Sequence, residues 1–262
     1  MGGAGMVPES MVKEKPIGIT PFDQEWPIAD GQIGKGTSPF PRVNRFISRV
    51  LETEFTVDHQ RACLVTEAYK NNEHEPQLIK CALALANVLK NAEIKITEDE
   101  LIVGEMAAPM KCASIFPEHS LSWVLDEIEN HPLDKRLHDQ YYVSKRSKKK
   151  LKQIESYWKG KSIDEVIISE LSEDEMKGTN LGRGFYLFNL YMYGGIGHLQ
   201  ANYEKLFNLG FGGLKELVRE KAAKLEQSGE NDQAKKDFYR AELITLDAAT
   251  NYIKRYATLA AA

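Results

Sequence analysis

The stretch YGGIGHLQANYEKLFNLGFGG, from Tyr193 to Gly213, is the most informative feature of the sequence. Three glycines lead directly into His198, and glycine is favoured where the backbone needs positive φ or approaches another group closely. Apolar side chains then recur at helical spacing between Leu199 and Phe207. The pattern predicts a loop that presents the imidazole, which is a common position for a binding or catalytic group. The local pattern alone also fits a structural histidine in a tight turn.

The composition is that of an ordinary globular protein. The chain has 262 residues, of which 42% are hydrophobic and 27% charged. A net charge of −4 provides no overall attraction to nucleic acid or to anionic membranes, and no run approaches the ~18 apolar residues of a membrane span. The three cysteines, Cys63, Cys81 and Cys112, form no CxxC pair. We therefore expect a cytoplasmic protein with reduced cysteines that binds neither nucleic acid nor membrane.

Prolines and glycines are concentrated in the first 41 residues, which hold six of the ten prolines and seven of the nineteen glycines. This composition predicts an extended arm over residues 1–41 without packed structure of its own. Residues 42–262 are mainly helical in pattern. A helix follows Pro76, and a long helix begins at about Gln233.

Apolar side chains predict which face of each of these two helices is buried. The helix after Pro76 has the stripe Leu78, Ala82, Leu85, Ala86 and Leu89, and the long helix has the stripe Phe238, Thr245, Ala249, Tyr252, Ile253, Tyr256 and Leu259. Capping boxes are expected at Thr97 with Glu100, Ser162 with Glu165, and Ser172 with Glu175. The short run Leu101–Val103 fits either a strand or a buried helix end.

Two polar features have both a functional and a structural interpretation. The basic run from Lys145 to Lys152 could contact nucleic acid, but it contains no aromatic residue. Leu151 and Ile154 favour a helix whose outer face is lysine-rich and solvated. Glu118 and His119 are expected to serve packing or capping. The histidines show no metal-ligand spacing, so we expect no metal site.

Six motifs along the chain are similar to those of one protein family. In order they are TEAYKNNEHEP (66–76), DELIVGE (99–105), FPEHS (116–120), YWKGKS (157–162), GGIGH (194–198) and NYEKLFNLGFGGL (202–214). Together they resemble the N-terminal part of a glycyl radical enzyme of the pyruvate formate-lyase superfamily. The branch that they most resemble is the B12-independent glycerol and diol dehydratases, and the resemblance runs from about Arg42 to Ala262.

The resemblance implies a mainly α chain: the truncated N-terminal helical part of the ten-stranded α/β barrel of glycyl radical enzymes. Residues 42–262 would then be an incomplete pyruvate formate-lyase domain. In this family a radical-SAM activating enzyme creates a glycyl radical near the C-terminus, and that radical generates a cysteine thiyl radical that abstracts hydrogen from the substrate. The implied partners are a small-molecule substrate, the activating enzyme and, at full length, a second copy in a homodimer. No cofactor is expected to be bound.

His198 matches the histidine of the family's Gly-x-Gly-His motif, which hydrogen-bonds a substrate hydroxyl in the dehydratases. An imidazole suits this role because one nitrogen can donate while the other accepts. The family's catalytic cysteine lies in a Cys-x-Glu motif, which none of the three cysteines fits, and the radical-glycine motif is absent as well. We therefore expect no catalytic residue in this chain and a substrate-binding role for His198.

The resemblance favours dehydration of a small polyol, such as glycerol or a diol, by the complete enzyme of an anaerobic metabolism. The fragment is not expected to be active alone, although the C-terminal part supplied in trans could complete it. Formate C-acetyltransferase activity and C–N or C–S bond cleavage remain alternatives within the superfamily. A non-catalytic helical interaction protein derived from the same scaffold is the alternative of a different class.

Overall fold

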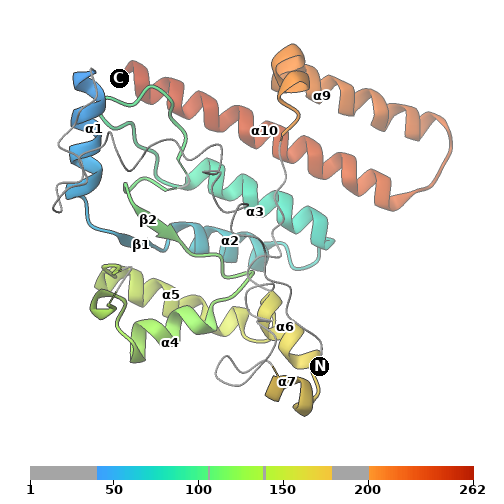
Figure 1. Ribbon diagram of the computed structural model, residues 1–262. Helices are drawn as coiled ribbons and strands as arrows, with labels where there is room; N and C mark the ends of the chain where they lie inside the picture. The colour runs from blue at the N-terminus through green and yellow to red at the C-terminus, as the bar shows by residue number, and fades with distance from the viewer. Residues whose placement is uncertain (1–39, 106, 138–139, 179–200) are drawn as a thin grey trace, which may run out of the picture. The chain divides into compact units, whose positions relative to one another are not determined.

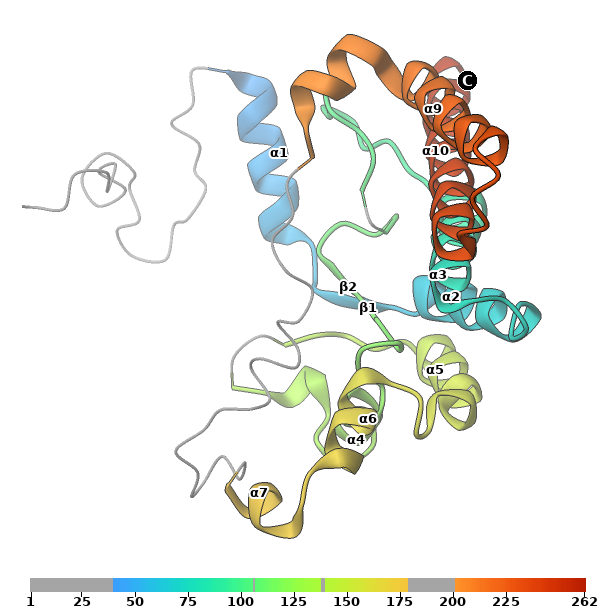
Figure 2. The same cartoon turned by 90° about the vertical axis from the view of Figure 1, so that its right-hand side faces the viewer.

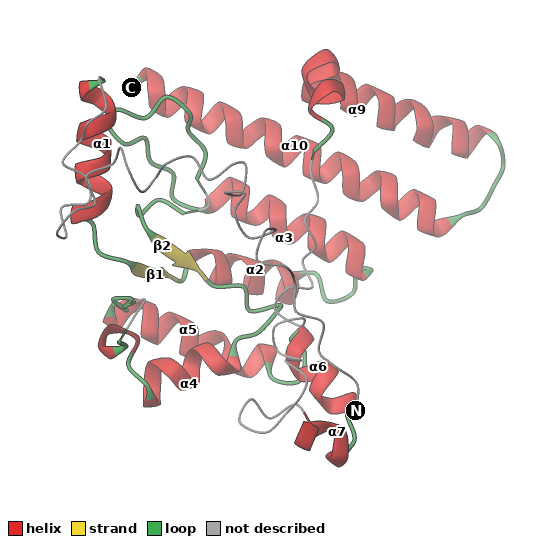
Figure 3. Ribbon diagram, in the orientation of Figure 1, coloured by secondary structure: helices red, strands yellow, loops and turns green. Residues whose placement is uncertain are grey.

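The computed structural model describes residues 40–105, 107–137, 140–178 and 201–262, and most of them are helical (Figures 1 and 3). The helices are α1 (Pro41–Glu52), α2 (Gln60–Asn71), α3 (Gln77–Asn91), α4 (Ser122–Asn130), the 3-10 turn η3 (Leu133–Lys135), α5 (Lys145–Trp158), α6 (Ile163–Glu170), α7 (Glu173–Gly178), α9 (Tyr203–Gln227) and α10 (Gln233–Ala261). Strands β1 (Thr56–Asp58) and β2 (Cys112–Ser114) form the sheet of the described part. The predicted mainly α character is confirmed.

The chain divides into two units, residues 1–52 and residues 53–262. In the first unit, the described residues form α1, which begins at Pro41, and the arm predicted over 1–41 lies almost entirely outside the described residues. The boundary of the arm therefore stays a prediction. In the second unit, six helices contact one another in the series α9, α10, α3, α2, α5 and α4 (Figure 2).

Two apolar cores hold this series together. The larger core joins α2, α4 and α5 and includes Leu151, which is fully buried, and Trp158. The smaller core lies between α3 and α10 and consists of Ile79, Ala82 and Ala241. Helix α3 therefore packs on two sides, against α2 and against α10.

This double packing explains why the predicted faces of α3 and α10 are only partly correct. In α3, Ala82 is buried as predicted, but Ile79 and Ala84 are buried as well, while Leu78 and Leu85 are exposed. In α10, the buried residues are Ala241, Ala248 and Tyr256, of which the sequence predicted only Tyr256. A helix that contacts neighbours on two sides buries small residues where backbones approach closely, so a single apolar stripe does not describe it.

The two strands pair in parallel, with Thr56 opposite Cys112 and Asp58 opposite Ser114. Parallel strands need a long crossover, and here the crossover contains α2 and α3. The prediction for Leu101–Val103 is wrong, because this run forms neither strand nor helix, and Leu101 and Ile102 are 76% and 91% exposed. No described strand pairs with it, so its apolar character alone does not make it a strand.

Two of the three predicted capping boxes lie at helix starts. Before α7, the Ser172 amide donates to the Glu175 carboxylate at 2.8 Å and the Glu175 amide donates to Ser172 Oγ at 3.3 Å. Ser162 is the N-cap of α6, with its hydroxyl 3.2 Å from Glu165. The Thr97 amide also donates to Glu100, at 2.7 Å, but these two residues close a turn rather than a helix.

Helix α9 begins at Tyr203, where the resumed periodicity predicted a helix, and Asn202 caps it by accepting a bond from the Lys205 amide at 2.9 Å. The helix is interrupted at Gly210, whose φ of 61° and ψ of 178° are not helical. Helix α10 starts at Gln233 as predicted, and Asp232 caps it. Within the described residues, none of the helices combines the length and the apolar character that crossing a lipid bilayer requires.

Candidate functional site

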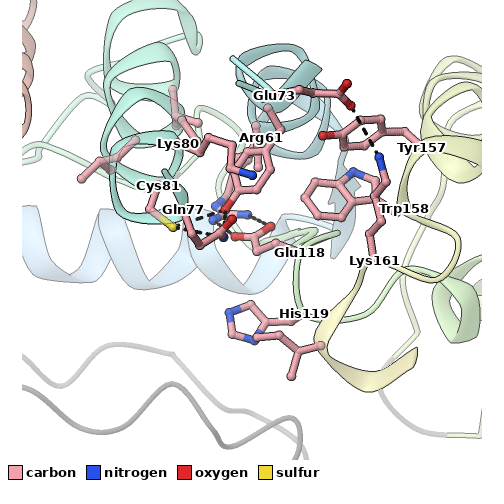
Figure 4. Close-up of a pocket in the computed structure, with 16 residues that line it drawn as sticks. Arg61, Glu73, Gln77, Lys80, Cys81, Glu118, His119, Tyr157, Trp158 and Lys161 are labelled. Atoms are coloured by element: carbon pink, nitrogen blue, oxygen red, sulfur yellow. Dashed lines mark hydrogen bonds and ion pairs between the residues drawn. The ribbon is translucent and has the colours of Figure 1, made fainter. Parts of the chain in front are cut away.

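A cavity of about 820 Å³ opens between α2, α3, the loop before α4 and the end of α5 (Figure 4). Its volume lies in the range of small-molecule sites in proteins. Figure 4 shows Arg61, Gln77 and Cys81 on one side of it, and Tyr157, Trp158 and Lys161 on the other. All of these residues belong to the second unit of the chain.

Arg61, in the first turn of α2, forms one wall through its pairing with Glu118. Both guanidinium amino groups bond the Glu118 carboxylate, the Nη1 contact being 3.1 Å, and Nη1 also donates to the Ile115 carbonyl at 3.3 Å. The guanidinium carbon lies 3.7 Å from the centroid of the Phe116 ring. A two-pronged contact with stacking uses the planar geometry of arginine, so these bonds hold the loop in one orientation.

The loop that carries Glu118 and His119 is also held from its other side, by α6. The amides of Ile163 and Asp164 donate to the carbonyls of Glu118 and His119, at 3.0 and 3.1 Å. The hydroxyl of buried Ser120 donates to the Asp164 carboxylate. The FPEHS motif is therefore a rigid connection, in which Glu118 and His119 face the cavity while their backbone is bonded to α6.

Aromatic residues form the deep wall of the cavity. Trp158 is buried, and its indole nitrogen donates to Thr66 Oγ1 at 2.8 Å. Its ring centroid lies 5.3 Å from that of Tyr69 and 5.3 Å from that of Tyr157. Such tilted and edge-on ring contacts stabilise aromatic clusters. The end of α5 is thereby attached to the middle of α2.

A small polar cluster joins α2 and α3 at the edge of this wall. The Tyr69 hydroxyl lies 3.3 Å from Cys81 Sγ and accepts a bond from the Gln77 side-chain amide at 3.1 Å. Burial, together with the hydrogen bond to Cys81, raises the pKa of the Tyr69 hydroxyl well above its usual value. Tyr69 therefore stays neutral at physiological pH and acts as a structural hydrogen-bonding group.

Three cations line the cavity, and two of them are paired. Arg61 pairs with Glu118, and Lys161 lies 3.5 Å from Glu73 and 4.0 Å from the centroid of the Tyr157 ring. Lys80 is half-buried, with its ammonium 5.8 Å from the centroid of the Tyr69 ring. No carboxylate of the described residues forms an ion pair with Lys80. His119 Nδ1 is buried and has no hydrogen-bond partner within the described part of the chain.

The residues predicted from the sequence lie in different places. His198, the predicted substrate-binding residue, falls outside the described residues. Cys63, Cys81 and Cys112 are free thiols, of which Cys81 lines the cavity, and burial raises the pKa of Cys112 in β2 to about 11. The described residues hold no cluster of side chains suited to a metal ion.

Sequence reasoning found the elements of the cavity but not the cavity itself. Glu118 serves packing as predicted, because it holds Arg61, but Glu118 and His119 also line a cavity. The basic run 145–152 lies on α5 with buried Leu151 and Ile154 and an exposed lysine-rich face, as predicted. The cavity forms between residues far apart in the sequence, and three of the six motifs, TEAYKNNEHEP, FPEHS and YWKGKS, supply residues that line it.

The sequence profile of the pyruvate formate lyase-like family matches residues 35–262. The chain belongs to this family. It is 38% identical over 244 residues to the (2S)-3-sulfopropanediol dehydratase of Klebsiella oxytoca. That alignment covers 93% of this chain and 30% of the relative. The resemblance inferred from the six motifs is thus confirmed.

Solved structures of this pyruvate formate lyase-like family agree with the fold. The glycerol-bound B12-independent glycerol dehydratase from Clostridium butyricum matches with a TM-score of 0.76 and 33% identity, over 87% of this chain and 29% of that chain. A glycyl radical enzyme from Archaeoglobus fulgidus matches with a TM-score of 0.75 and 33% identity, over 84% and 28%. The chain therefore spans about 30% of the length of the proteins that it matches, and the predicted helical part of the glycyl radical enzyme fold is confirmed.

Proposed function

We propose that this chain is the N-terminal helical part of a glycyl radical dehydratase that removes water from a small polyol such as glycerol or a 1,2-diol. The observation that carries the proposal is the likeness to two dehydratases, by sequence to the sulfopropanediol enzyme and by structure to the glycerol-bound enzyme. Sulfopropanediol and glycerol, after which these two enzymes are named, both contain adjacent hydroxyl groups. The activity belongs to the complete protein, of which these residues match about 30%.

Within this proposal, His198 hydrogen-bonds a hydroxyl group of the substrate. The support is its motif, in which Gly195 and Gly197 precede it. A neutral imidazole can donate to one oxygen and accept from another group, and it can also exchange a proton near neutral pH. Each of these capacities helps a hydroxyl to leave as water.

The cysteines of this chain do not fit the position of a thiyl radical. Cys63, Cys81 and Cys112 are not followed by glutamate two residues later. We assign the radical-bearing cysteine and glycine to the remainder of the protein. A radical-SAM activating enzyme, a homodimeric full-length form and a cytoplasmic location stay part of the proposal.

Anaerobic assay of the complete protein, co-expressed with its activating enzyme, tests this function. Glycerol should be converted to 3-hydroxypropanal with loss of one water, and electron paramagnetic resonance should detect the glycyl radical. The chain of residues 1–262 alone should show neither signal, whereas adding the remaining part in trans could restore both. Release of sulfite from isethionate or of trimethylamine from choline, without dehydration, would contradict the dehydratase assignment.

A second assay tests His198. His198→Ala in the complete enzyme should lower turnover at least about a hundredfold, the scale of a lost acid–base or hydrogen-bonding group, while the radical signal persists. The matched control is His74→Ala, because His74 is largely exposed and lies in the turn between α2 and α3. Equal turnover in the two variants would contradict a substrate-binding role for His198.

A further inference from the structure

We propose that the cavity beside α3 is a binding site for a small organic anion, with its acid group at Lys80 and its apolar body against the aromatic wall. This inference rests on described residues and goes beyond the dehydratase function. Its test does not depend on the outcome of the dehydratase assay.

The charges around the cavity are unequal. Arg61, Lys80 and Lys161 face it, whereas Glu73 and Glu118 are the two carboxylates that line it. Each carboxylate is bonded to one cation, Glu118 to Arg61 and Glu73 to Lys161. Lys80 is thus the cation of the described lining that has no acidic partner. An anion can therefore bind its ammonium without displacing a carboxylate.

The surroundings of Lys80 favour an anion with an apolar body. Its ammonium lies 5.8 Å from the centroid of the Tyr69 ring, and the residue as a whole is half-buried. Val65, Leu85 and Val88 supply apolar lining of the same cavity, which suits an aromatic or aliphatic ligand.

Other polar groups of the cavity already form hydrogen bonds within the protein, and this limits where the acid group of a ligand can bind. The Arg61 guanidinium bonds Glu118 and the Ile115 carbonyl, and the Gln77 amide bonds Tyr69 and Cys81. His119, whose Nδ1 has no partner in the described part, lines the same cavity. A monoanion with one further polar atom therefore fits the set better than a dianion.

Ligand-observed fluorine NMR on the 262-residue chain tests the proposal. The probe is 4-fluorophenylacetate, and 2-(4-fluorophenyl)ethylamine is a probe of similar shape and opposite charge. The acetate should bind and the amine should not. Lys80→Gln should weaken binding of the acetate about tenfold, the effect of losing one charged hydrogen bond.

Lys90→Gln is the matched control, since Lys90 lies on the same helix but outside the cavity, and it should bind the acetate as the parent does. Circular dichroism verifies that both variants are folded. Equal binding of acetate and amine, or undiminished binding by Lys80→Gln, would overturn the proposal, as would absence of acetate binding.

Alkylation of Cys81 supplies an independent measurement. Cys81 lines the cavity and is an exposed residue, so bound 4-fluorophenylacetate should slow its reaction with N-ethylmaleimide, read by peptide mass spectrometry. The protection should be lost in Lys80→Gln and kept in Lys90→Gln. An identical alkylation rate with and without the acetate contradicts binding in this cavity.

Discussion

At the scale of single residues, Trp158 links two helices that are distant in the sequence. Its indole nitrogen bonds Thr66, 92 residues away, and its ring packs against Tyr69. Thr66 in turn donates to the Ala62 carbonyl at 2.6 Å. The hydroxyl of Thr66 therefore acts both as a hydrogen-bond acceptor and as a donor.

Trp158→Phe keeps an aromatic ring but removes the donor and part of the buried volume. We expect a loss of about 2 kcal/mol in the free energy of unfolding, measured by urea denaturation. Trp123→Phe is the control, because the Trp123 side chain is 45% exposed and should change stability by less than about 0.5 kcal/mol. Equal costs would mean that the bond to Thr66 contributes little.

Arg61 provides a second prediction at this scale. Arg61→Lys keeps the charge but loses the two-pronged contact with Glu118 and the stacking on Phe116, so we expect a loss of about 1–2 kcal/mol. Arg219→Lys is the matched control, since Arg219 pairs with Glu216 on an exposed surface and should cost about 0–0.5 kcal/mol. Urea denaturation compares the two, and a similar cost would contradict a special role of Arg61.

At the scale of elements, the interruption of α9 depends on one residue. Gly210 has a backbone conformation that residues with a side chain rarely adopt, although a Cβ at this position would meet nothing within 4 Å. Gly210→Ala should therefore destabilise the protein by about 1–3 kcal/mol through backbone strain alone.

Gly212 lies two residues away in the same helix and is the natural control for Gly210. A Cβ there also meets nothing within 4 Å, and the φ of Gly212 is not in the positive range that strains residues with a side chain. Gly212→Ala should stabilise the protein by about 0.5–1 kcal/mol, because alanine favours helix. Thermal unfolding of the two variants should shift in opposite directions, and shifts of the same sign would argue against strain at Gly210.

The contact between α3 and α10 depends on Arg255. Its guanidinium donates to the carbonyls of Leu89 and Ala92, both at 2.6 Å, where α3 ends. Arg255→Met should leave these carbonyls without a protein donor and cost about 1–3 kcal/mol. Hydrogen exchange should become faster at the last amides of α3, whereas Lys254→Met, at an exposed position, should leave it unchanged.

At the scale of the whole molecule, one ion pair makes stability depend on pH. Arg240 of α10 bonds both carboxylate oxygens of Glu75, at 2.8 and 2.6 Å, and this contact lowers the pKa of Glu75. A lowered pKa stabilises the folded protein above the pKa of the unfolded state, about 4.3, and this stabilisation is lost as the pH falls through the folded value.

Glu75→Gln removes this dependence. The parent should be more stable than the variant at pH 7, and the difference in unfolding free energy should shrink towards pH 3. Urea denaturation at a series of pH values measures it, with Glu226→Gln, at an exposed position, as the control. A difference in unfolding free energy that is constant with pH would show that the contact with Arg240 does not lower the pKa of Glu75.

Local features of this molecule were predictable, and long-range ones were not. The start of α10 at Gln233, the cap at Ser172 and the lysine-rich face of α5 follow from spacing and capping chemistry over a few residues. The buried residues of α3 do not, because they depend on which helices pack on each side. The cavity likewise depends on Arg61 meeting Glu118 across 57 residues, and the role of His198 stays a prediction.

The link between Thr66 and Trp158 also has a consequence for the living cell. A ribosome adds about 5–20 residues per second, so roughly 5 to 20 seconds pass between the synthesis of Thr66 and that of its partner, 92 residues later. During that interval α2 and α3 exist without the wall that α5 provides. Until α5 has been made, the Tyr69 side of α2 in the nascent chain lacks its aromatic partner Trp158. A chaperone that recognises aromatic surface can bind there during this interval.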